Sequence, residues 1–419
     1  MFKRFLFLFL IAVSFQLNAI FPMNYFRYAE RGLLLNWREK DDTSCLFFNM
    51  GPSEGGIKID GRNDEGEKVN FLQIWNKNQD SLAMLRGFGA DTTIGKLAAK
   101  VGNISNDIDD RGRFLPTANL DFVGNAVELG FKKCSFSLSA YLPYYYMKLK
   151  NVEWESLTKD PLVEDSLVKK GLAANFKDLN SLTESLGGLK LGGWTKSGIG
   201  DLVFMGRYFR DFQQRGRQIT NVKLHCNLGL SVPTAKLKNE DYAFDIPFGN
   251  DGAWAMYTGA GLEVTWWNFL RGGGSVQFLQ IFGTTKERRI MTDKNQTDLL
   301  FLAKCKAYKD YGFTPTYMLF LEAVTKPVQV RVSYQHLKHS RDSLSLLSNT
   351  YSNDVANEAP SLKEWTNHQF IFSATFDFFA NFKKKPKLLP KFYTFYKLPF
   401  NGKRMVQAHT FGGGLSFDF

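Results

Sequence analysis

The sequence predicts an all-β fold, a transmembrane antiparallel β-barrel of about twelve strands (ten to fourteen), with an N-terminal segment that could plug its lumen. Three observations predict this fold: long unbroken alternation of apolar and polar residues, an export signal at the N-terminus, and no apolar run long enough for a spanning helix. The chain has 419 residues, of which 44% are hydrophobic and 15% aromatic. This composition excludes a wholly disordered chain.

Residues 1–19 have the three-part layout of a cleavable secretory signal. Lys3 and Arg4 precede an apolar run, and Leu17, Asn18 and Ala19 follow it. We expect cleavage near Ala19, which removes two cations and lowers the formal charge from +12 to about +10. A basic exported chain does not indicate nucleic acid as a partner. The expected location is the cell outer membrane of a Gram-negative-type envelope.

Alternation is the primary strand signal. In residues 221–232, NVKLHCNLGLSV, every second residue is apolar or small, which is typical of a strand with one apolar and one polar face. The same pattern occurs in 253–266, 328–335 and 368–378. These strands are longer than those of most soluble sheets and match the length needed to cross a bilayer. Weaker candidates are 120–131, 134–148, 199–209, 275–284, 299–308, 313–325, 391–398 and 406–419.

The predicted barrel spans residues 117–419, and its connections expose a conflict. Such barrels have short turns on the periplasmic side and long loops outside. Counting up and down along the predicted strands puts the long polar loops 149–196 and 341–363 on opposite sides. One strand is therefore missed or invented, either within 20–116 or at 299–308.

Residues 20–116 are rich in Gly, Asp and Asn, with short apolar pieces such as VNFLQIW and SLAMLRGFG. Three interpretations remain open: a partial plug in the lumen, a short periplasmic segment, or an early strand plus loops. The four cysteines, Cys45, Cys134, Cys226 and Cys305, are too sparse for a disulfide scaffold, and we expect them to act as small apolar residues.

One region resembles a known family. The stretches SGIGDLVFMGRYF, LHCNLGLSVPTAKL and IPFGNDGAWAMYTGAGLEVTWW, within residues 195–285, are similar to outer-membrane channels associated with the meta-pathway of phenol degradation, distant relatives of the long-chain fatty acid channel. The positions that carry the resemblance are Gly198, Gly200, Asp201, Pro233, Thr234, Gly249, Gly252 and Trp254. Ala235 departs from the pattern, because a glycine is usual there. The resemblance implies a monomeric barrel that passes small, often hydrophobic molecules.

The polar face of the strands would line the lumen. The candidate pore-lining residues are Lys223, His225, Asn227, Tyr257, Glu263, Lys304, Lys306, Gln329, Arg331 and Gln335. An excess of lumenal cations would favour anions, but the same charges could instead pair across strands. Asp201 could likewise accept turn N–H groups after Gly200 or act as a lumenal ligand.

Sequence motifs for other chemistry are weak. His336 and His339 would lie on opposite faces of a strand, so we expect no metal site and no cofactor. His339-Ser340 and His409-Thr410 are the only neighbours that suggest a hydrolase, and we expect no catalytic residues and no enzyme.

The function predicted from these features is passive, porin-like uptake of small molecules, hydrophobic or aromatic ones included, through an outer-membrane channel. Alternatives are a surface-exposed binding or structural protein anchored by its barrel, and an outer-membrane enzyme of lipase or protease type. Phe417 and Phe419 at the C-terminus resemble the strand signal that outer-membrane assembly machinery recognises. The expected partners are therefore this machinery, the lipid bilayer and a small-molecule solute.

Overall fold

The computed structural model describes residues 45–101, 110–158, 176–380 and 389–419. The predicted signal at 1–19 and its cleavage site lie outside these residues.

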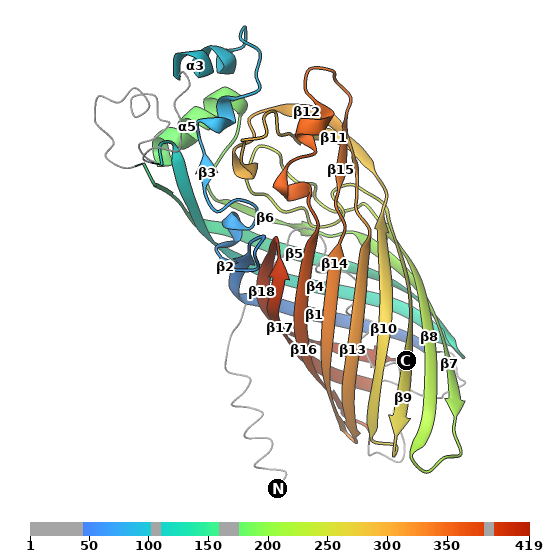
Figure 1. Cartoon of the computed structure of the whole chain (residues 1–419). Coiled ribbons are helices and arrows are strands. Elements are labelled where there is room, and N and C mark those ends of the chain that lie inside the picture. The colour runs from blue at the N-terminus through green and yellow to red at the C-terminus, as the bar shows by residue number, and fades with distance from the viewer. Residues whose placement is uncertain (1–44, 102–109, 159–175, 381–388) are drawn as a thin grey trace.

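Twelve antiparallel strands form a closed barrel, in which each strand pairs with its neighbour and β1 pairs with both β4 and β18. Figure 1 shows the barrel as a tilted cylinder with the loops gathered at one end. The barrel strands are β1 (Cys45–Arg62), β4 (Arg113–Lys133), β5 (Phe136–Ser156), β7 (Leu202–Gln213), β8 (Ile219–Val232), β9 (Ala255–Trp266), β10 (Leu270–Ile281), β13 (Thr314–Thr325), β14 (Val328–His339), β16 (Trp365–Asp377), β17 (Leu389–Lys403) and β18 (Met405–Asp418).

The prediction of about twelve strands is confirmed, but two errors cancel in it. The predicted strand 299–308 is not part of the barrel: Leu299 and Leu300 lie in a 3-10 turn, and β12 (Lys304–Asp310) belongs to a separate small sheet. The missing barrel strand is β1, which falls within 20–116, so the barrel does not begin at residue 117. The early-strand interpretation of that segment is therefore correct for residues 45–62.

Irregular pairing explains why β1 was missed. The register of β1 against β18 shifts between Met50 and Ser53 and again between Gly56 and Lys58. Each bulge adds one residue to β1, so beyond it the odd-numbered and even-numbered side chains exchange faces of the sheet. The alternation is broken twice within 18 residues, so no long periodic run is visible in the sequence.

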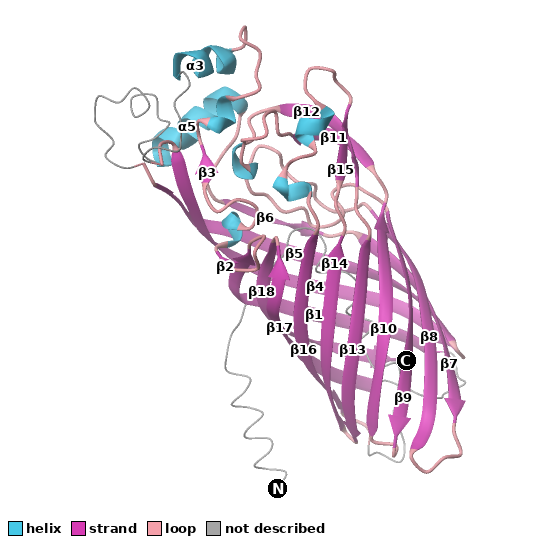
Figure 2. Cartoon of the chain, in the orientation of Figure 1, coloured by secondary structure: helices cyan, strands magenta, loops and turns pink. Residues whose placement is uncertain are grey.

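With 299–308 removed from the strand count, most connections sort by length. The short turns 134–135, 214–218, 267–269 and 326–327 lie at one end, which we call the turn end. The long connections 63–112, 157–193, 233–254, 282–313 and 340–364 lie at the other end, which we call the capped end. Two connections are exceptions: Arg404 alone joins β17 to β18 at the capped end, and residues 378–388 join β16 to β17 at the turn end. Figure 2 shows that the helices gather at the capped end. Because 299–308 is not a barrel strand, 149–196 and 341–363 lie at the same end, which resolves the predicted conflict.

Short elements build a cap over this end. A three-stranded sheet of β11 (Thr284–Arg289), β12 and β15 (Ser343–Leu346) lies beside short helices and turns. The other cap and rim elements are β2 (Lys68–Val69), β3 (Gln79–Asp80), β6 (Trp194–Ile199), α3 (Thr93–Val101), α5 (Phe176–Gly187), α6 (Asn353–Ala356) and the 3-10 turns η1 (Phe71–Gln73), η2 (Ala83–Leu85), η3 (Asp298–Leu300) and η4 (Pro360–Leu362).

The apolar pieces of the N-terminal segment are buried under this cap. Phe71 and Met84 have no exposed surface and pack with Phe114 and Phe122 of β4 in one cluster. Asn70 fixes the start of η1, because its side chain accepts the Leu72 N–H and donates to the Ala118 carbonyl of β4. The described part of the segment thus packs against β4 at the capped end.

The outer face of the barrel is apolar. Large hydrophobic side chains remain exposed along the strands, among them Leu129, Leu138, Phe204, Leu228, Leu262, Leu319, Leu321, Val330 and Phe372. Aromatic side chains on this face are also exposed, among them Tyr144 and Tyr146 in the middle of β5 and Trp267 directly after β9. This pattern is typical of a surface that faces lipid, with girdles at the interfaces.

Among the described residues, none of the helices combines the length and apolarity that a membrane crossing requires.

Candidate functional site

The motif positions converge on one buried carboxylate at the capped end. Asp201, between β6 and β7, accepts the Ala235 N–H at 3.1 Å and the Asn250 N–H at 2.6 Å. A Cβ on Gly249 would lie 2.2 Å from the Asp201 carboxyl carbon, so only glycine fits there. Asp201 therefore ties two loops to the start of β7.

A second tie comes from Thr234. Its hydroxyl donates to the Gly200 carbonyl at 2.9 Å and accepts the Leu202 N–H at 2.9 Å. Gly200 has no room for a side chain, because an added Cβ would lie 2.6 Å from Pro143. Asp201, Gly200 and Thr234 thus hold the loop after β8 and the segment around Asn250 against the start of β7.

The remaining motif positions are peripheral. Gly198 packs against the Lys236 side chain, and Trp254 is 46% exposed. Pro233 lies directly after β8.

The predicted pore-lining residues divide into two groups. Eight of them, on β8, β9 and β14, lie on the face opposite the exposed apolar residues and so face inward. They are Lys223, His225, Asn227, Tyr257, Glu263, Gln329, Arg331 and Gln335. Lys304 and Lys306 do not line the barrel: both lie on β12 in the cap, where Lys304 pairs with Asp241. That part of the prediction was wrong because 299–308 is not a barrel strand.

Inward charges are paired with neighbouring strands. Arg331 Nη2 lies 3.3 Å from Glu322, and Arg271 Nη1 lies 3.9 Å from the same carboxylate. His225 Nδ1 on β8 lies 3.9 Å from the Glu263 carboxylate on β9. Gly261 is the next residue of β9 on the same inner face. This is the arrangement that the cross-strand pairing alternative expects.

Parts of the inner wall are tightly packed. Gln335 and Gln369 have no exposed surface, and Glu322 and Glu128 are each 1% exposed. His225 and Glu263 retain 21% of their side-chain exposure. The inner wall is thus more accessible around His225 and Glu263 than around these four residues.

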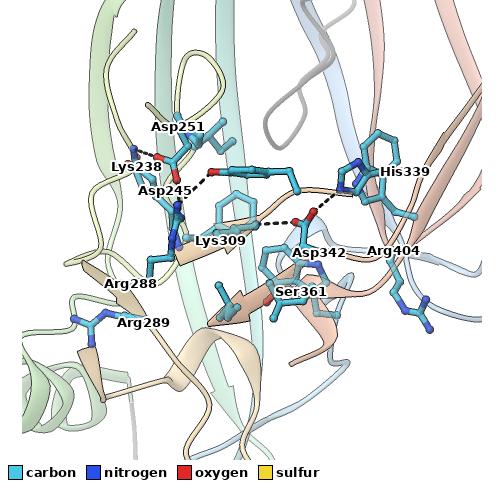
Figure 3. Close-up of a pocket in the computed structure, with 18 of the residues that line it drawn as sticks. Lys238, Asp245, Asp251, Arg288, Arg289, Lys309, His339, Asp342, Ser361 and Arg404 are labelled. Carbon is cyan, nitrogen blue, oxygen red and sulfur yellow. Dashed lines mark hydrogen bonds and ion pairs between the residues drawn. The ribbon is translucent and has the colours of Figure 1, made fainter. Parts of the chain in front are cut away.

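A cavity of about 160 Å³ lies between the barrel rim and the cap (Figure 3). One part of its wall is apolar and aromatic, with Trp75, Phe244, Ile246, Leu337, Leu344, Leu362, Trp365 and Met405. The other part is charged, with Lys238, Glu240, Asp245, Asp251, Arg288, Arg289, Lys309, His339, Asp342 and Arg404. The cavity can therefore contact both the apolar and the polar part of a small molecule.

Asp251 organises one side of the cavity. Its fully buried carboxylate lies 2.7 Å from Lys286 Nζ and 3.0 Å from Arg288 Nη1, and it accepts the Lys238 N–H. Burial alone would raise the pKa of Asp251, but Lys286 and Arg288 hold it below its ordinary value. Glu240 adds a second carboxylate, 3.4 Å from Lys286.

Asp342 organises the other side, as Figure 3 shows. Its carboxylate lies 2.7 Å from Lys309 Nζ and 2.8 Å from His339 Nε2, and it accepts the Gly312 N–H. Although burial opposes it, the Lys309 ammonium and His339 hold the pKa of Asp342 well below its usual range.

Hydrogen bonds connect Thr314, His339 and Asp342 in the order of a hydrolase triad, but Thr314 is not accessible to a substrate. Thr314 Oγ1 lies 2.8 Å from His339 Nδ1. Thr314 is only 3% exposed and is not among the residues that line the cavity. A nucleophile must reach its substrate, so this chain of hydrogen bonds fixes β13 to β14 instead.

Asp298 is a further buried acid of the cap. Its Oδ1 accepts the Ser361 N–H, and its own N–H donates to Asn76. Burial raises the pKa of Asp298 to about 6. The carboxyl of Asp298 thus connects η3 to η4, and its backbone N–H connects η3 to the N-terminal segment.

Sequence reasoning missed this cavity. Its charged residues come from loops far apart in the chain, and no spacing joins them. The available signals were the basic run KERR at 286–289 and the acidic loop 240–251, whose pairing needed the fold. Within the described part of the chain, no cluster of three or more His, Cys, Asp or Glu side chains is arranged to hold a metal ion.

Fold and site together define a closed membrane-type barrel whose own loops cap one end over a small amphipathic cavity. No family model matches the sequence, and no curated protein matches it. Among solved structures, an outer membrane channel from Pseudomonas putida F1 is similar, with 10% identity, 90% of this chain and 94% of the other covered, and a TM-score of 0.44. The β domain of the Bordetella autotransporter BrkA has 10% identity, 90% and 99% coverage, and a TM-score of 0.31. A mutant of the monoaromatic hydrocarbon channel TodX, a Pseudomonas putida toluene transporter, has 9% identity, 90% and 91% coverage, and a TM-score of 0.33. Values this low identify neither a family nor a function.

Proposed function

We propose that the chain is an outer-membrane channel for passive uptake of small molecules, with hydrophobic or aromatic molecules among its solutes. The observation that carries the proposal is the amphipathic cavity at the capped mouth of a barrel with an apolar outer wall. A solute that enters from the capped side would meet Trp75 and Trp365 on one side and Arg288 and Lys309 on the other.

Sidedness follows from the loops. Barrels of this class have short turns on the periplasmic side, so the capped end faces outward. The solute would pass from the cavity along the inner wall to the more accessible region around His225 and Glu263, down its own gradient and without ATP or a cofactor. We propose that the barrel acts as a monomer, as the resemblance to phenol meta-pathway channels implies.

Opening has to precede passage. The inner wall is packed around Gln335 and Gln369, and the cap is held by Asp251 and Asp342. Movement of the cap, together with rearrangement of the side chains around Gln335 and Gln369, is therefore the expected gate. The geometry also favours one alternative, a binding or structural protein that uses the barrel only as an anchor, because a filled interior is what an anchor needs.

Planar-bilayer conductance tests the proposal. Strand β10 pairs directly with β13, so residues 284–310 can be replaced by a short Gly-Ser turn without breaking the barrel. We expect the full-length protein to open rarely and this variant to conduct steadily. Liposome swelling with small aromatic solutes and with sugars of equal size then reports selectivity. The absence of conductance from both proteins, with the barrel folded, would favour the anchor.

A further inference from the structure

Three of the five histidines lie on the outer wall of the barrel, and the proposed channel uses none of them. His336 is on β14, His368 on β16 and His409 on β18. All three are partly buried and share the face of the exposed apolar residues. They lie in the halves of these strands nearer the capped end.

Their height on the wall is marked by the neighbouring side chains. Toward the capped end, the outward residues of β14 are Val330, Val332, Tyr334, His336 and Lys338, with Val330 48% exposed and Val332 40% exposed. Strand β16 repeats this order with Phe372, Phe370, His368 and Thr366. The histidines therefore lie where an apolar surface, then aromatic side chains, give way to polar and charged ones, which is the membrane interface.

The two central histidines form a pair. His336 and His368 oppose each other directly across β14 and β16, with ring centroids 4.4 Å apart and nearly parallel planes. A parallel stack does not direct two lone pairs at one ion, which disfavours a metal site. It does present two ring N–H groups side by side to a neighbouring acceptor.

Tyrosine hydroxyls orient two of the rings. Tyr334 Oη lies 2.7 Å from His368 Nδ1, and Tyr396 Oη lies 3.0 Å from His409 Nδ1. A hydroxyl that donates to Nδ1 leaves the proton of the neutral ring on Nε2. In that tautomer each uncharged ring carries its N–H on Nε2, and a protonated ring carries an N–H on both nitrogens.

Lysines add positive charge at the same rim. Lys338 lies close enough to His336 to interact with it electrostatically, and Lys403, exposed on β17, pairs in register with Thr366. Glu364 lies 3.3 Å from Lys338 Nζ, but both side chains are about half exposed, at 57% and 47%. An exposed pair of this kind is weak, so the rim keeps a net positive character.

We propose that this histidine patch, His336, His368, His409, Lys338 and Lys403, binds a phosphate group of lipopolysaccharide in the outer leaflet. Ring N–H groups and ammonium groups suit phosphate oxygens, and the exposed Phe370 and Phe372 below them suit the acyl chains of the same lipid. The inference rests on the outer-membrane location of the proposed function and is independent of channel activity.

Binding of diphosphoryl lipid A to the purified full-length protein in detergent tests this proposal, with affinity from native mass spectrometry and the shift in Tm as a second readout. We expect dephosphorylated lipid A to bind about tenfold more weakly or worse, because it lacks the phosphate groups that accept charge-assisted hydrogen bonds. Phosphatidylethanolamine keeps one phosphodiester, which carries a single negative charge beside its own ammonium group, and should bind more weakly than diphosphoryl lipid A. The variant His336→Phe/His368→Phe keeps two flat rings on a lipid-facing surface and removes the N–H groups. It should lose about tenfold in affinity for diphosphoryl lipid A.

Lys148→Gln, next to the exposed Tyr146 on β5, is the matched control, because it removes an interfacial cation where no histidine lies. It should stay within about twofold of wild type. Equal affinity for dephosphorylated lipid A would overturn the phosphate site, and equal affinity for phosphatidylethanolamine would overturn lipopolysaccharide as its ligand. Unchanged binding by His336→Phe/His368→Phe would overturn the role of the histidines. Conductance in a bilayer free of lipopolysaccharide separates failure of this site from failure of the channel.

Discussion

Neutralising Asp251 should release the cap while the barrel stays folded. Asp251→Asn keeps an oxygen that can accept the Lys238 N–H, but it removes the charge opposite Arg288, whose side chain is only 7% exposed. The other hydrogen bonds of Arg288 go to the hydroxyls of Thr284 and Tyr311. A buried guanidinium would then have no carboxylate beside it.

The expected cost follows from the burial of this pair. Removing one partner of a buried ion pair costs about 3–5 kcal/mol. Lys286 keeps Glu240 at 3.4 Å and is 18% exposed, so the lower end applies. We expect about 3 kcal/mol, which corresponds to about 150-fold more frequent opening of the cap.

Hydrogen exchange followed by mass spectrometry measures this opening directly. Peptides 238–254 and 284–311 should exchange faster in Asp251→Asn, whereas peptides from β13 and β14 should not change. Asp121→Asn is the control, because Asp121 pairs with Lys150 at 2.6 Å but both are about 40% exposed, at 43% and 41%. Its expected effect is about 0–1 kcal/mol.

The reasoning is refuted if Asp251→Asn and Asp121→Asn change cap exchange equally. A uniform change in the barrel peptides would also refute it, since the effect would then be global. The double variant Asp251→Asn/Arg288→Met should recover much of the loss, because a buried pair replaced by apolar groups is often neutral.

Three further predictions concern buried groups. Because burial raises the pKa of Asp298 from 3.8 to about 6, ionisation should weaken the cap by about 3 kcal/mol as pH rises through this window. Asp298→Asn should then exchange more slowly than wild type at pH 7.5, and equal protection factors of the wild-type cap at pH 4 and pH 7.5, after correction for intrinsic exchange, would contradict this. Gly261→Ala would place a Cβ 2.3 Å from the His225 ring and should lower the free energy of unfolding in urea by about 1–3 kcal/mol. Gly206→Ala, whose Cβ would have its nearest atom at 3.6 Å, should be nearly neutral. Equal urea midpoints for the two variants would count against the overpacking argument. Asp201→Asn turns one of two acceptor oxygens into a donor that faces a backbone N–H and should lower stability by about 1–3 kcal/mol. The measurement is faster hydrogen exchange around Ala235 and Asn250, whose N–H groups Asp201 accepts. Unchanged exchange there would mean that these hydrogen bonds add little stability.

Much of the barrel was predictable because lipid imposes period two on every regular strand. Strands such as β8 alternate without a break, and their inward residues Lys223 and His225 were identified from parity alone. The conflict in loop sidedness came from 299–308, because a strand that precedes both loops, as β1 does, leaves their relative side unchanged. Alternation could not identify either error, because the bulges of β1 hide its alternation and β12 alternates as a soluble strand does.

The candidate site was less predictable. The resemblance selected Gly200, Asp201 and Thr234, but not the N–H groups of Ala235 and Asn250 that Asp201 accepts, because backbone donors leave no trace in residue type.

The sequence by itself determined that this chain forms a barrel with an apolar outside and a polar inside, because every side chain that faces lipid has to be compatible with the same apolar surroundings. Only the tertiary structure decided which end is capped, that inward cations such as Arg331 have carboxylates beside them, and that Asp251, Arg288 and Asp342 surround one cavity. These features depend on contacts between residues tens to hundreds of positions apart. Such contacts are set by strand order and register, which residue spacing along the chain does not record.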